Sequence, residues 1–460
     1  MANRIIGICK LLLLCGFLAA CAEYQLYEPA PIDIEETTRI YREIDLDSEP
    51  LKTLLGSSGH DVSDWPKHQW DLEELVTVAE YYHSELAISK VKLKLAKAKE
   101  VSAGQKNNPQ LAFSTEHHSD HTEGKSPWSF GTIFSWVYER PEKRQTRIDH
   151  ATAITEVARL EQFEILWTIR DDVTDNYLDT ISAINQQTML LEEKSVLEQG
   201  IDLLQRRIEF GQASEFEISS LRLERQRLTL SLSELEADEV RARSRLALAT
   251  GLPADALQAT DLKQDYFHKL PILSSADLEL GLLQTRALIE RPDLLRSLST
   301  YVVAEADLHL QIEKQYPDIT LSPGFIFDQG DNVWAMASAW VLPIKAKNTG
   351  GIAEAEARRM LKAQQFLAFQ KRVLSQVHYA RISYQAALKT LAEADLLIND
   401  LDVRNQKLQR QFDLGYTDRL ALIRSQLETL TVRRSRYLLK LTAWREFESL
   451  EDALMSRLIK

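Results

Sequence analysis

Residues 316–359 read YPDITLSPGFIFDQGDNVWAMASAWVLPIKAKNTGGIAEAEARR. Bulky side chains alternate with small or polar ones over 319–327, and Trp334, Met336 and Trp340 then alternate with alanines. A period of two indicates β-strands, and the two kinds of side chain predict a sheet with two different surroundings. From Thr349 onward the stretch is rich in Ala, Glu and Arg, which are good helix formers. We therefore expect a pair of strands that leads directly into a helix.

The helices must be unusually long. Residues 352–414 are 63 consecutive positions without glycine or proline, and one helix over that range is about 95 Å long. Leucine and isoleucine recur at spacings of three and four in 197–208 and in 420–444, where Arg434 is the one charged interruption. This spacing predicts helices that wrap around one another. We predict antiparallel pairs of long helices over about 147–210 with 214–250, and 350–413 with 417–456.

The chain also repeats itself. Residues 108–111, 139–143 and 209–211 are echoed, in the same order, by 316–319, 341–345 and 413–415, at offsets of 208, 202 and 204. Three weak echoes can arise by chance, but their constant order and spacing favour an internal duplication. We predict a first repeat over 67–253, a connector over 254–275 and a second repeat over 276–456. The expected strands are about 109–116, 128–138, 317–327 and 333–343.

The strands are of the length that a tilted transmembrane β-strand needs, about ten residues. A soluble sandwich would show similar alternation, but it would not be interrupted by helical blocks of this size. Four strands cannot close a barrel, and an open sheet edge cannot face lipid. A trimer sharing one barrel supplies twelve strands, an even number within the known range. The predicted membrane-facing aromatic residues are Trp128, Phe130, Phe134, Trp136, Trp334 and Trp340.

The N-terminus predicts export. Arg4 and Lys10 are followed by a short apolar run and then by Leu18-Ala19-Ala20-Cys21, which has the features of a secretory signal over 1–20 and resembles the lipobox of bacterial lipoproteins. The alternative is an ordinary signal peptide with an incidental cysteine. The resemblance implies lipidation at Cys21, followed by an extended tether over 21–66. Loss of the signal changes the formal charge from −13 to −15, and so acidic a chain is a poor candidate for binding nucleic acid.

In order and architecture, the sequence over about 70–455 resembles the TolC-type outer membrane efflux family, and more particularly its heavy-metal-resistance branch. The segments that carry the resemblance are 316–359, its counterpart from Asn108 to Ala153, and RIEFGQASEFEISSLRLE at 207–224. The resemblance implies a mainly α-helical homotrimer with a twelve-stranded barrel in the outer membrane and an α-helical tunnel in the periplasm. It also implies a periplasmic adaptor and an inner-membrane proton-driven pump of the RND class as partners. The chain would be a passive conduit for metal cations, with no enzymatic activity and no cofactor.

The turns between the paired helices are the second group of candidate residues. In the resembling family they form the periplasmic tip where the adaptor docks, which implies that role for Gly211, Ser214, Gly415, Thr417 and Asp418. Family members often carry two acidic residues after the second glycine, and this chain has Ala421 and Arg424 there instead. The candidates for a tunnel constriction are therefore Glu215, Glu217 and Arg424. Helix capping is the competing interpretation for Glu217 and Asp418.

Three histidines lie close together in the turn of the first predicted hairpin, at His117, His118 and His121. Imidazoles are common ligands of zinc and copper, so a metalloenzyme or metal-storage protein is one alternative. The simpler interpretation is a solvated outer loop, and the second hairpin has no matching histidines. A further alternative, within the same architecture, is an exit duct for drugs or for secreted polypeptides. No GxxxxGK[ST] motif is present, so any driving energy must come from a partner.

Overall fold

The computed structural model describes residues 26–119, 124–264, 267 and 270–459. The predictions for the signal segment, Cys21 and His121 therefore lie outside the described residues. The chain divides into two compact units, residues 1–44 and 45–460. In the first unit, helix α2 (Ile34–Arg42) begins at Asp33, whose carboxylate accepts hydrogen bonds from the amides of Glu35 and Glu36.

The prediction of an extended tether over 21–66 is therefore wrong for part of its length. Besides α2, the second unit has helix α3 (Glu49–Ser57), with Pro50 in its first turn. Proline is tolerated there because the first amides of a helix have no partner within it. Leu51 and Leu55 of α3 are fully buried, and α3 packs against the next helix. Burial of one face of α3 stabilises a helix that is too short to be stable by itself.

The second unit is mainly helical. Its helices are α4 (Leu72–Tyr82), α5 (Ser84–Ala103), α6 (Pro141–Glu209), α7 (Glu215–Thr250), α9 (Leu280–Glu290), α10 (Pro292–Glu313), α11 (Thr349–Asp413) and α12 (Arg419–Leu454). Helix α6 begins six residues before the expected 147, because Pro141 occupies its first turn. With 69 residues, α6 is about 104 Å long at 1.5 Å per residue.

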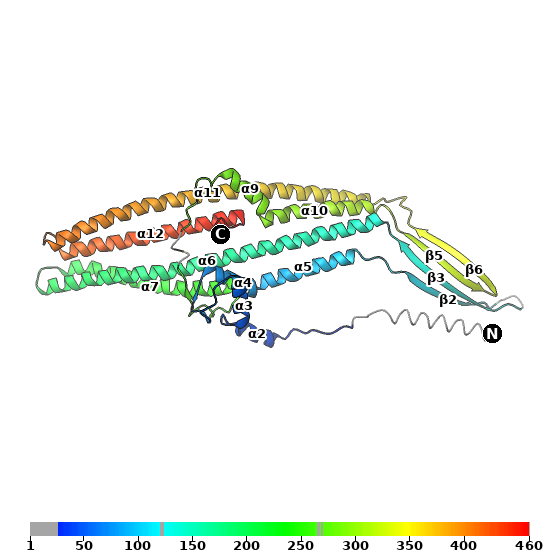
Figure 1. Ribbon diagram of the computed structural model, residues 1–460, viewed down its shortest axis with the longest axis horizontal. Coiled ribbons are helices and arrows are strands. Elements are labelled where there is room, and N and C mark those ends of the chain that lie inside the picture. The colour runs from blue at the N-terminus through cyan, green and yellow to red at the C-terminus, as the bar shows by residue number, and fades with distance from the viewer. Residues whose placement is uncertain (1–25, 120–123, 265–266, 268–269, 460) are drawn as a thin grey trace. The chain divides into compact units, whose positions relative to one another are not determined.

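The long helices are paired side by side, α6 with α7 and α11 with α12 (Figure 1). Near the turns, an apolar seam holds α6, α7 and the start of α12 together. Its buried members are Leu190, Leu197, Ile201, Leu204, Ile218, Leu228, Leu232 and Leu420. The spacing of three and four in 197–208 thus buries one face of α6, as a coiled-coil seam does. Helix α12 also packs along α6, which connects the two halves of the chain.

The four longer strands form one antiparallel sheet in the order β2-β3-β5-β6. They span Gln110–His117 (β2), Trp128–Tyr138 (β3), Ile319–Asp328 (β5) and Asp331–Trp340 (β6). The two hairpins join at β3 and β5, where Phe130 is opposite Phe327 and Tyr138 opposite Ile319. Strands β2 and β6 are the two edges of this sheet (Figure 1). Because α6 follows directly after β3, the sheet and the helical turns lie at opposite ends of α6.

The connector between the halves is held against the middle of the helices. Strand β4 (Asp261–Leu262) pairs in parallel with β1 (Gln69–Trp70), a small sheet that the sequence did not predict. Three buried aromatic side chains bond to connector carbonyls: Trp444 Nε1 donates to Phe267 O at 3.0 Å, Tyr177 to Lys263 O, and Tyr384 to Pro271 O. Each contributes an apolar ring to the core and a polar end to the connector.

None of the helices in the described ranges combines the length and apolar character needed to cross a membrane.

Candidate functional site

The turns between the long helices are built alike in the two halves. Gly211 and Gly415 both adopt the left-handed conformation, with φ of +67° and +78°. The amide of Gln212 donates to Arg207 O at 2.7 Å, and that of Tyr416 donates to Gln411 O at 2.8 Å. A backward bond of this span, after a left-handed glycine, closes the last helical turn. The glycine at each predicted tip is therefore required by the backbone.

Large apolar side chains surround both turns without being covered. Phe210, Phe216, Leu414 and Tyr416 are between 70% and 84% exposed. Single exposed apolar residues are ordinary, whereas a cluster at the end of a helical hairpin marks a contact surface. We call these four residues the apolar tip. Our sequence analysis had selected the polar residues of the turns and missed the apolar ones beside them.

The polar residues of the tip act mainly on the ends of the helices. Glu217 accepts from the Ser214 amide at 3.3 Å, which is the side-chain half of a capping box. Asp418 accepts from the Leu420 amide at 2.9 Å and so caps α12. Asp418, and not the preceding Thr417, is the N-cap residue of this helix. Glu215 lies 3.6 Å from Arg222 on the same helix.

Asp418 has a second role, since it binds Arg207 of the other half through two hydrogen bonds of 2.8 and 2.6 Å. The hydrogen bond to Arg207 holds the pKa of Asp418 below its usual value, and the charge of Arg424 acts in the same direction. Arg424 itself is exposed one turn into α12. Sequence reasoning missed Arg207, because the bond joins residues that are 211 positions apart.

At the other end of α6, the sheet has one aromatic and one small-residue face. Residues directly opposite each other in the register share a face, so Trp128, Phe130, Phe134 and Trp136 of β3 share theirs with Phe325 and Phe327 of β5. Through Phe325, opposite Trp334, this face continues onto β6 and includes Trp340. The six aromatic residues predicted to face a membrane are all on it and are 44–81% exposed. The other face carries mostly small or polar residues, including Ser129, Gly131, Ser135, Gly324 and alanines of β6, together with Ile133, Val137, Ile326 and Val333.

The described histidines of the first hairpin do not converge on one site. His117 is opposite Trp128 on the aromatic face, and their rings are 4.6 Å apart. His118 instead bonds to Ser129 Oγ at 3.0 Å and lies 3.6 Å from Asp328, on the small-residue side. Consecutive residues of a strand point to opposite faces, so these two imidazoles cannot bind the same ion. A metal-contacting role for His117, His118 and His121 stays a prediction.

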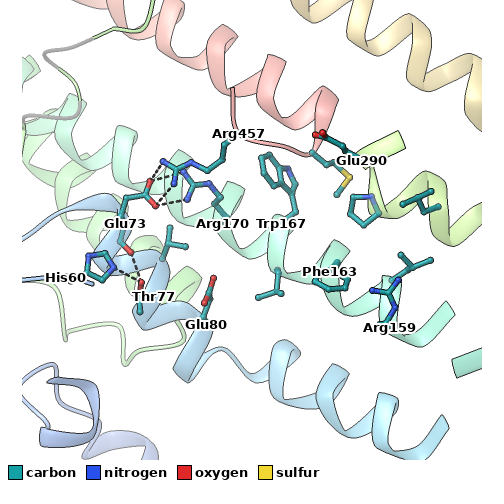
Figure 2. Close-up of a pocket in the computed structure, with 16 residues that line it drawn as sticks. His60, Glu73, Thr77, Glu80, Arg159, Phe163, Trp167, Arg170, Glu290 and Arg457 are labelled. Atoms are coloured by element: carbon teal, nitrogen blue, oxygen red, sulfur yellow. Dashed lines mark hydrogen bonds and ion pairs between the residues drawn. The ribbon is translucent and has the colours of Figure 1, made fainter. Parts of the chain in front are cut away.

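A cavity of about 580 Å³ lies beside α4, α6 and the start of α10 (Figure 2). On its wall, Glu73 accepts hydrogen bonds from Arg170, at 3.0 Å, and from Arg457, at 2.8 and 3.2 Å. Burial alone would raise the pKa of Glu73, but the two guanidinium groups hold it below its usual value. The network attaches the C-terminal segment to α4 and α6. None of the residues selected from the sequence lines this cavity.

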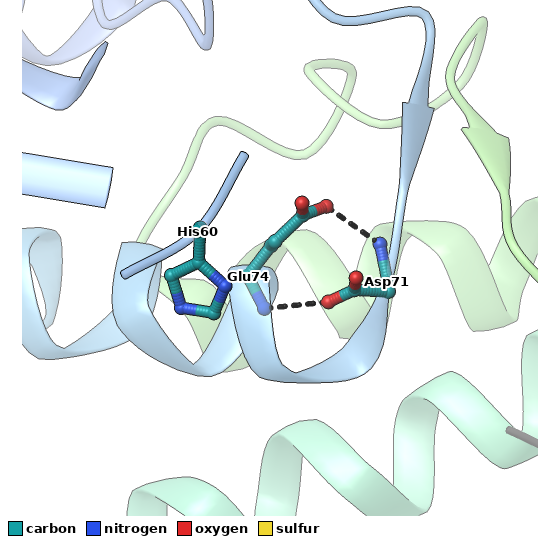
Figure 3. Close-up of side chains that lie close together, drawn as sticks. All are labelled: His60, Asp71 and Glu74. Atoms are coloured by element: carbon teal, nitrogen blue, oxygen red, sulfur yellow. Dashed lines mark hydrogen bonds between the residues drawn. The ribbon is translucent and has the colours of Figure 1, made fainter. Parts of the chain in front are cut away.

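A second cluster places His60, Asp71 and Glu74 with ligating atoms within 4.8 Å of one another (Figure 3). Asp71 and Glu74 form a reciprocal capping box, with both bonds at 2.9 Å. The ammonium of Lys67 pairs with Glu74, and that of Lys263 lies 3.5 Å from Asp71. Because lysines already neutralise these carboxylates, the cluster is explained as the capped start of α4 rather than as a metal centre.

Comparison with known proteins gives a structural result. No family model and no curated protein matches the chain. Solved structures do: the outer membrane protein VceC of Vibrio cholerae matches with a TM-score of 0.67 and 17% identity over 84% of this chain and 97% of that one. The outer-membrane channel OprN matches with a TM-score of 0.65 and 16% identity over 95% of this chain and 99% of that one.

CusC, whose crystal structures concern folding and transmembrane channel formation, matches with a TM-score of 0.64 and 17% identity over 86% of this chain and 95% of that one. At these identities the likeness establishes the fold. The chain has the fold of TolC-type outer-membrane channels, with long paired helices and a small antiparallel sheet.

Proposed function

We propose that this chain is one protomer of a homotrimeric outer-membrane channel that works in a tripartite efflux system. The observation that carries the proposal is the two-faced, four-stranded sheet, whose edges β2 and β6 are open at the end of helices about 100 Å long. A sheet with aromatic side chains on one face and small ones on the other suits lipid outside and a lumen inside. In this role the protein is a passive conduit and catalyses no reaction.

The strand order supports closure by three copies. Neighbouring strands within the protomer are all antiparallel, so β2 and β6 run in opposite directions. Strand β6 of one copy can therefore pair with β2 of the next, and the alternation continues around the ring. Three protomers supply twelve strands and leave no edge exposed to lipid.

The helical part extends from the barrel into the periplasm in this proposal, where the apolar tip binds a periplasmic adaptor. The adaptor connects the channel to an inner-membrane RND pump that supplies the energy. The lipid at Cys21 anchors the chain in the outer membrane. The sequence resemblance to the heavy-metal branch supports metal cations as the substrates.

The central test is assembly and conduction by the purified protein. Native mass spectrometry of the detergent-solubilised protein should show a trimer, and the protein should form ion-conducting pores in planar lipid bilayers. A matched variant carries Trp334→Lys and Met336→Lys, which place two charges on the aromatic face of the edge strand β6. It should abolish trimers and pores while leaving the helices unchanged. A monomer that forms no pores in the unaltered chain would refute the proposal.

The substrate is tested in cells. A strain lacking the protein should become more sensitive to zinc, cobalt, cadmium, copper or silver, and the intact gene should restore tolerance. Equal metal tolerance combined with increased sensitivity to drugs or detergents would assign drug export instead. Loss of one secreted polypeptide from the medium, with unchanged tolerance of metals and drugs, would assign protein secretion.

A further inference from the structure

The segment that follows β6 differs from its counterpart in the first half of the chain. Residues 341–347 read VLPIKAK and connect β6 to α11 (Figure 1). Val341, Leu342 and Ile344 are between 61% and 79% exposed, which is unusual for three large apolar side chains in four positions. Two exposed lysines, Lys345 and Lys347, follow directly. We call residues 341–347 the β6–α11 segment.

The segment is held at both ends, so its exposure is a property of the fold. Trp340, just before it, is opposite Ile319 in the sheet. Asn348, just after it, adopts a left-handed conformation with φ of +55° and donates from its side chain to Gln311 O at 2.8 Å. The apolar side chains therefore lie between a paired strand and the end of α10.

The counterpart in the first half, residues 139–145, and the nearby Arg147 have their charges satisfied within the protomer. Lys143 Nζ lies 2.9 Å from Asp318, and Arg147 is 2.6 Å from Glu139. The guanidinium of Arg140 lies over the Tyr316 ring at 4.3 Å. In contrast, the described part of the chain provides no ion-pair partner for Lys345 or Lys347. Among the described residues, the β6–α11 segment thus combines two lysines without an ion pair and three exposed apolar side chains.

We propose that the β6–α11 segment binds anionic phospholipids at the inner surface of the membrane. Leu342 and Ile344 would insert among the acyl chains, and the two ammonium groups would bind headgroup phosphates. This rests on the proposed function, since it requires β6 to lie in a bilayer. Lysine suits this position because its long stem stays apolar while its charge reaches the polar surface. In the sequence, Leu342 and Ile344 continue the two-residue spacing of Trp334, Met336 and Trp340, and they follow directly after the end of β6 at Trp340.

The experiment places a fluorophore in the segment. The only cysteine after the signal segment is Cys21, which carries the lipid, so Ile344→Cys can be labelled selectively with bimane. The labelled trimer is reconstituted into vesicles that contain equal amounts of phosphatidylglycerol and phosphatidylcholine, with brominated acyl chains on only one of the two lipids. We expect stronger quenching by brominated phosphatidylglycerol. A basic residue near an anionic surface contributes about 1 kcal/mol to binding. Each lysine should therefore increase the local preference for phosphatidylglycerol over phosphatidylcholine roughly fivefold.

Lys345→Gln with Lys347→Gln should remove the preference for phosphatidylglycerol while quenching by both lipids remains. The matched control is Lys97→Gln with Lys99→Gln on α5, an exposed pair with the same spacing, and it should leave the preference unchanged. Added inorganic phosphate should not compete. An unchanged preference in the first variant, or no quenching by either lipid, overturns the inference.

Conduction by the same vesicles separates the two proposals. Vesicles that conduct ions but show no lipid quenching refute the role of the β6–α11 segment and leave the channel proposal standing. Vesicles that fail to conduct, with a properly assembled trimer, refute the channel proposal itself.

Discussion

Arg434 interrupts an otherwise apolar spacing in α12, and the structure predicts that removing this interruption destabilises the protein. Arg434 Nη1 lies 3.3 Å from Glu193 Oε2 of α6. The Glu193 side chain is 8% exposed, and its other oxygen accepts from Thr431 Oγ1 at 3.2 Å. The ion pair therefore joins the two halves of the chain inside their interface. From the sequence pattern alone, Arg434→Leu should improve the packing of the helices.

The expected loss of stability arises because Arg434→Leu leaves the buried carboxylate of Glu193 without its partner. Breaking a buried pair by removing one partner costs about 3–5 kcal/mol, because the remaining charge loses its compensation. The Arg434 side chain is 29% exposed, so water reaches part of the site, and we expect a loss nearer to about 2 kcal/mol. Replacing both partners, with Glu193→Leu and Arg434→Leu, should restore most of this stability or exceed it.

The assay is unfolding of the purified protein in detergent, followed by circular dichroism during heating and in denaturant. The matched control is Arg433→Leu. Arg433 is the adjacent residue, and its pair with Asp402 at 3.0 Å is about half exposed, so its loss should cost at most about 1 kcal/mol. An Arg434→Leu protein as stable as the unaltered chain would refute the reasoning, as would a double variant no more stable than Arg434→Leu.

Four further predictions follow from other sites. Burial and neighbouring aspartates raise the pKa of Asp171 from 3.8 to about 7. Between about pH 4 and 7 the folded chain therefore retains a proton that the unfolded chain releases, so the free energy of unfolding should fall as the pH rises. Thermal unfolding of Asp171→Asn, followed over this pH range, should lack this decrease. Gly415→Ala should lower the free energy of unfolding by about 1 kcal/mol, because its φ of +78° is unfavourable for alanine even though a Cβ atom there would meet no other atom. Gly350→Ala, in a helix, should not lower the free energy of unfolding in the same denaturant assay. Tyr416→Ser should weaken binding of a purified adaptor in surface plasmon resonance without lowering stability, and unchanged binding would remove the apolar tip as the docking site. Arg424→Ala should alter the closed-state conductance in planar bilayers, and an unchanged value would exclude Arg424 from the constriction.

The local elements of this protein are encoded in short-range sequence patterns. Long runs without glycine or proline define the helices, since nothing in them interrupts the backbone hydrogen bonds. Alternation of large and small residues defines the strands, since consecutive side chains point to opposite faces. The helices expected at 214–250 and 350–413 lie at Glu215–Thr250 and Thr349–Asp413. The expected strand at 128–138 is β3, Trp128–Tyr138.

Short helices near the N-terminus were harder to foresee. The helix α3 depends on Leu51 and Leu55 being buried against a neighbouring helix, and a nine-residue helix is not stable by itself. The short strand β4 likewise exists only because the connector passes beside β1. In both cases the stabilising partner is outside the local sequence, so the pattern of residues could not reveal it.

The sequence by itself determined the long helices, the two strand hairpins and the positions of the two turns between paired helices. Each of these features depends on residues within a few positions of one another. Only the tertiary structure decided which charges are paired. It assigned Asp418 to Arg207 and Arg434 to Glu193, and left Lys345 and Lys347 exposed. Electrostatic and hydrogen-bond partners are chosen by distance in space, and residues about 200 positions apart become neighbours only when the two halves pack together.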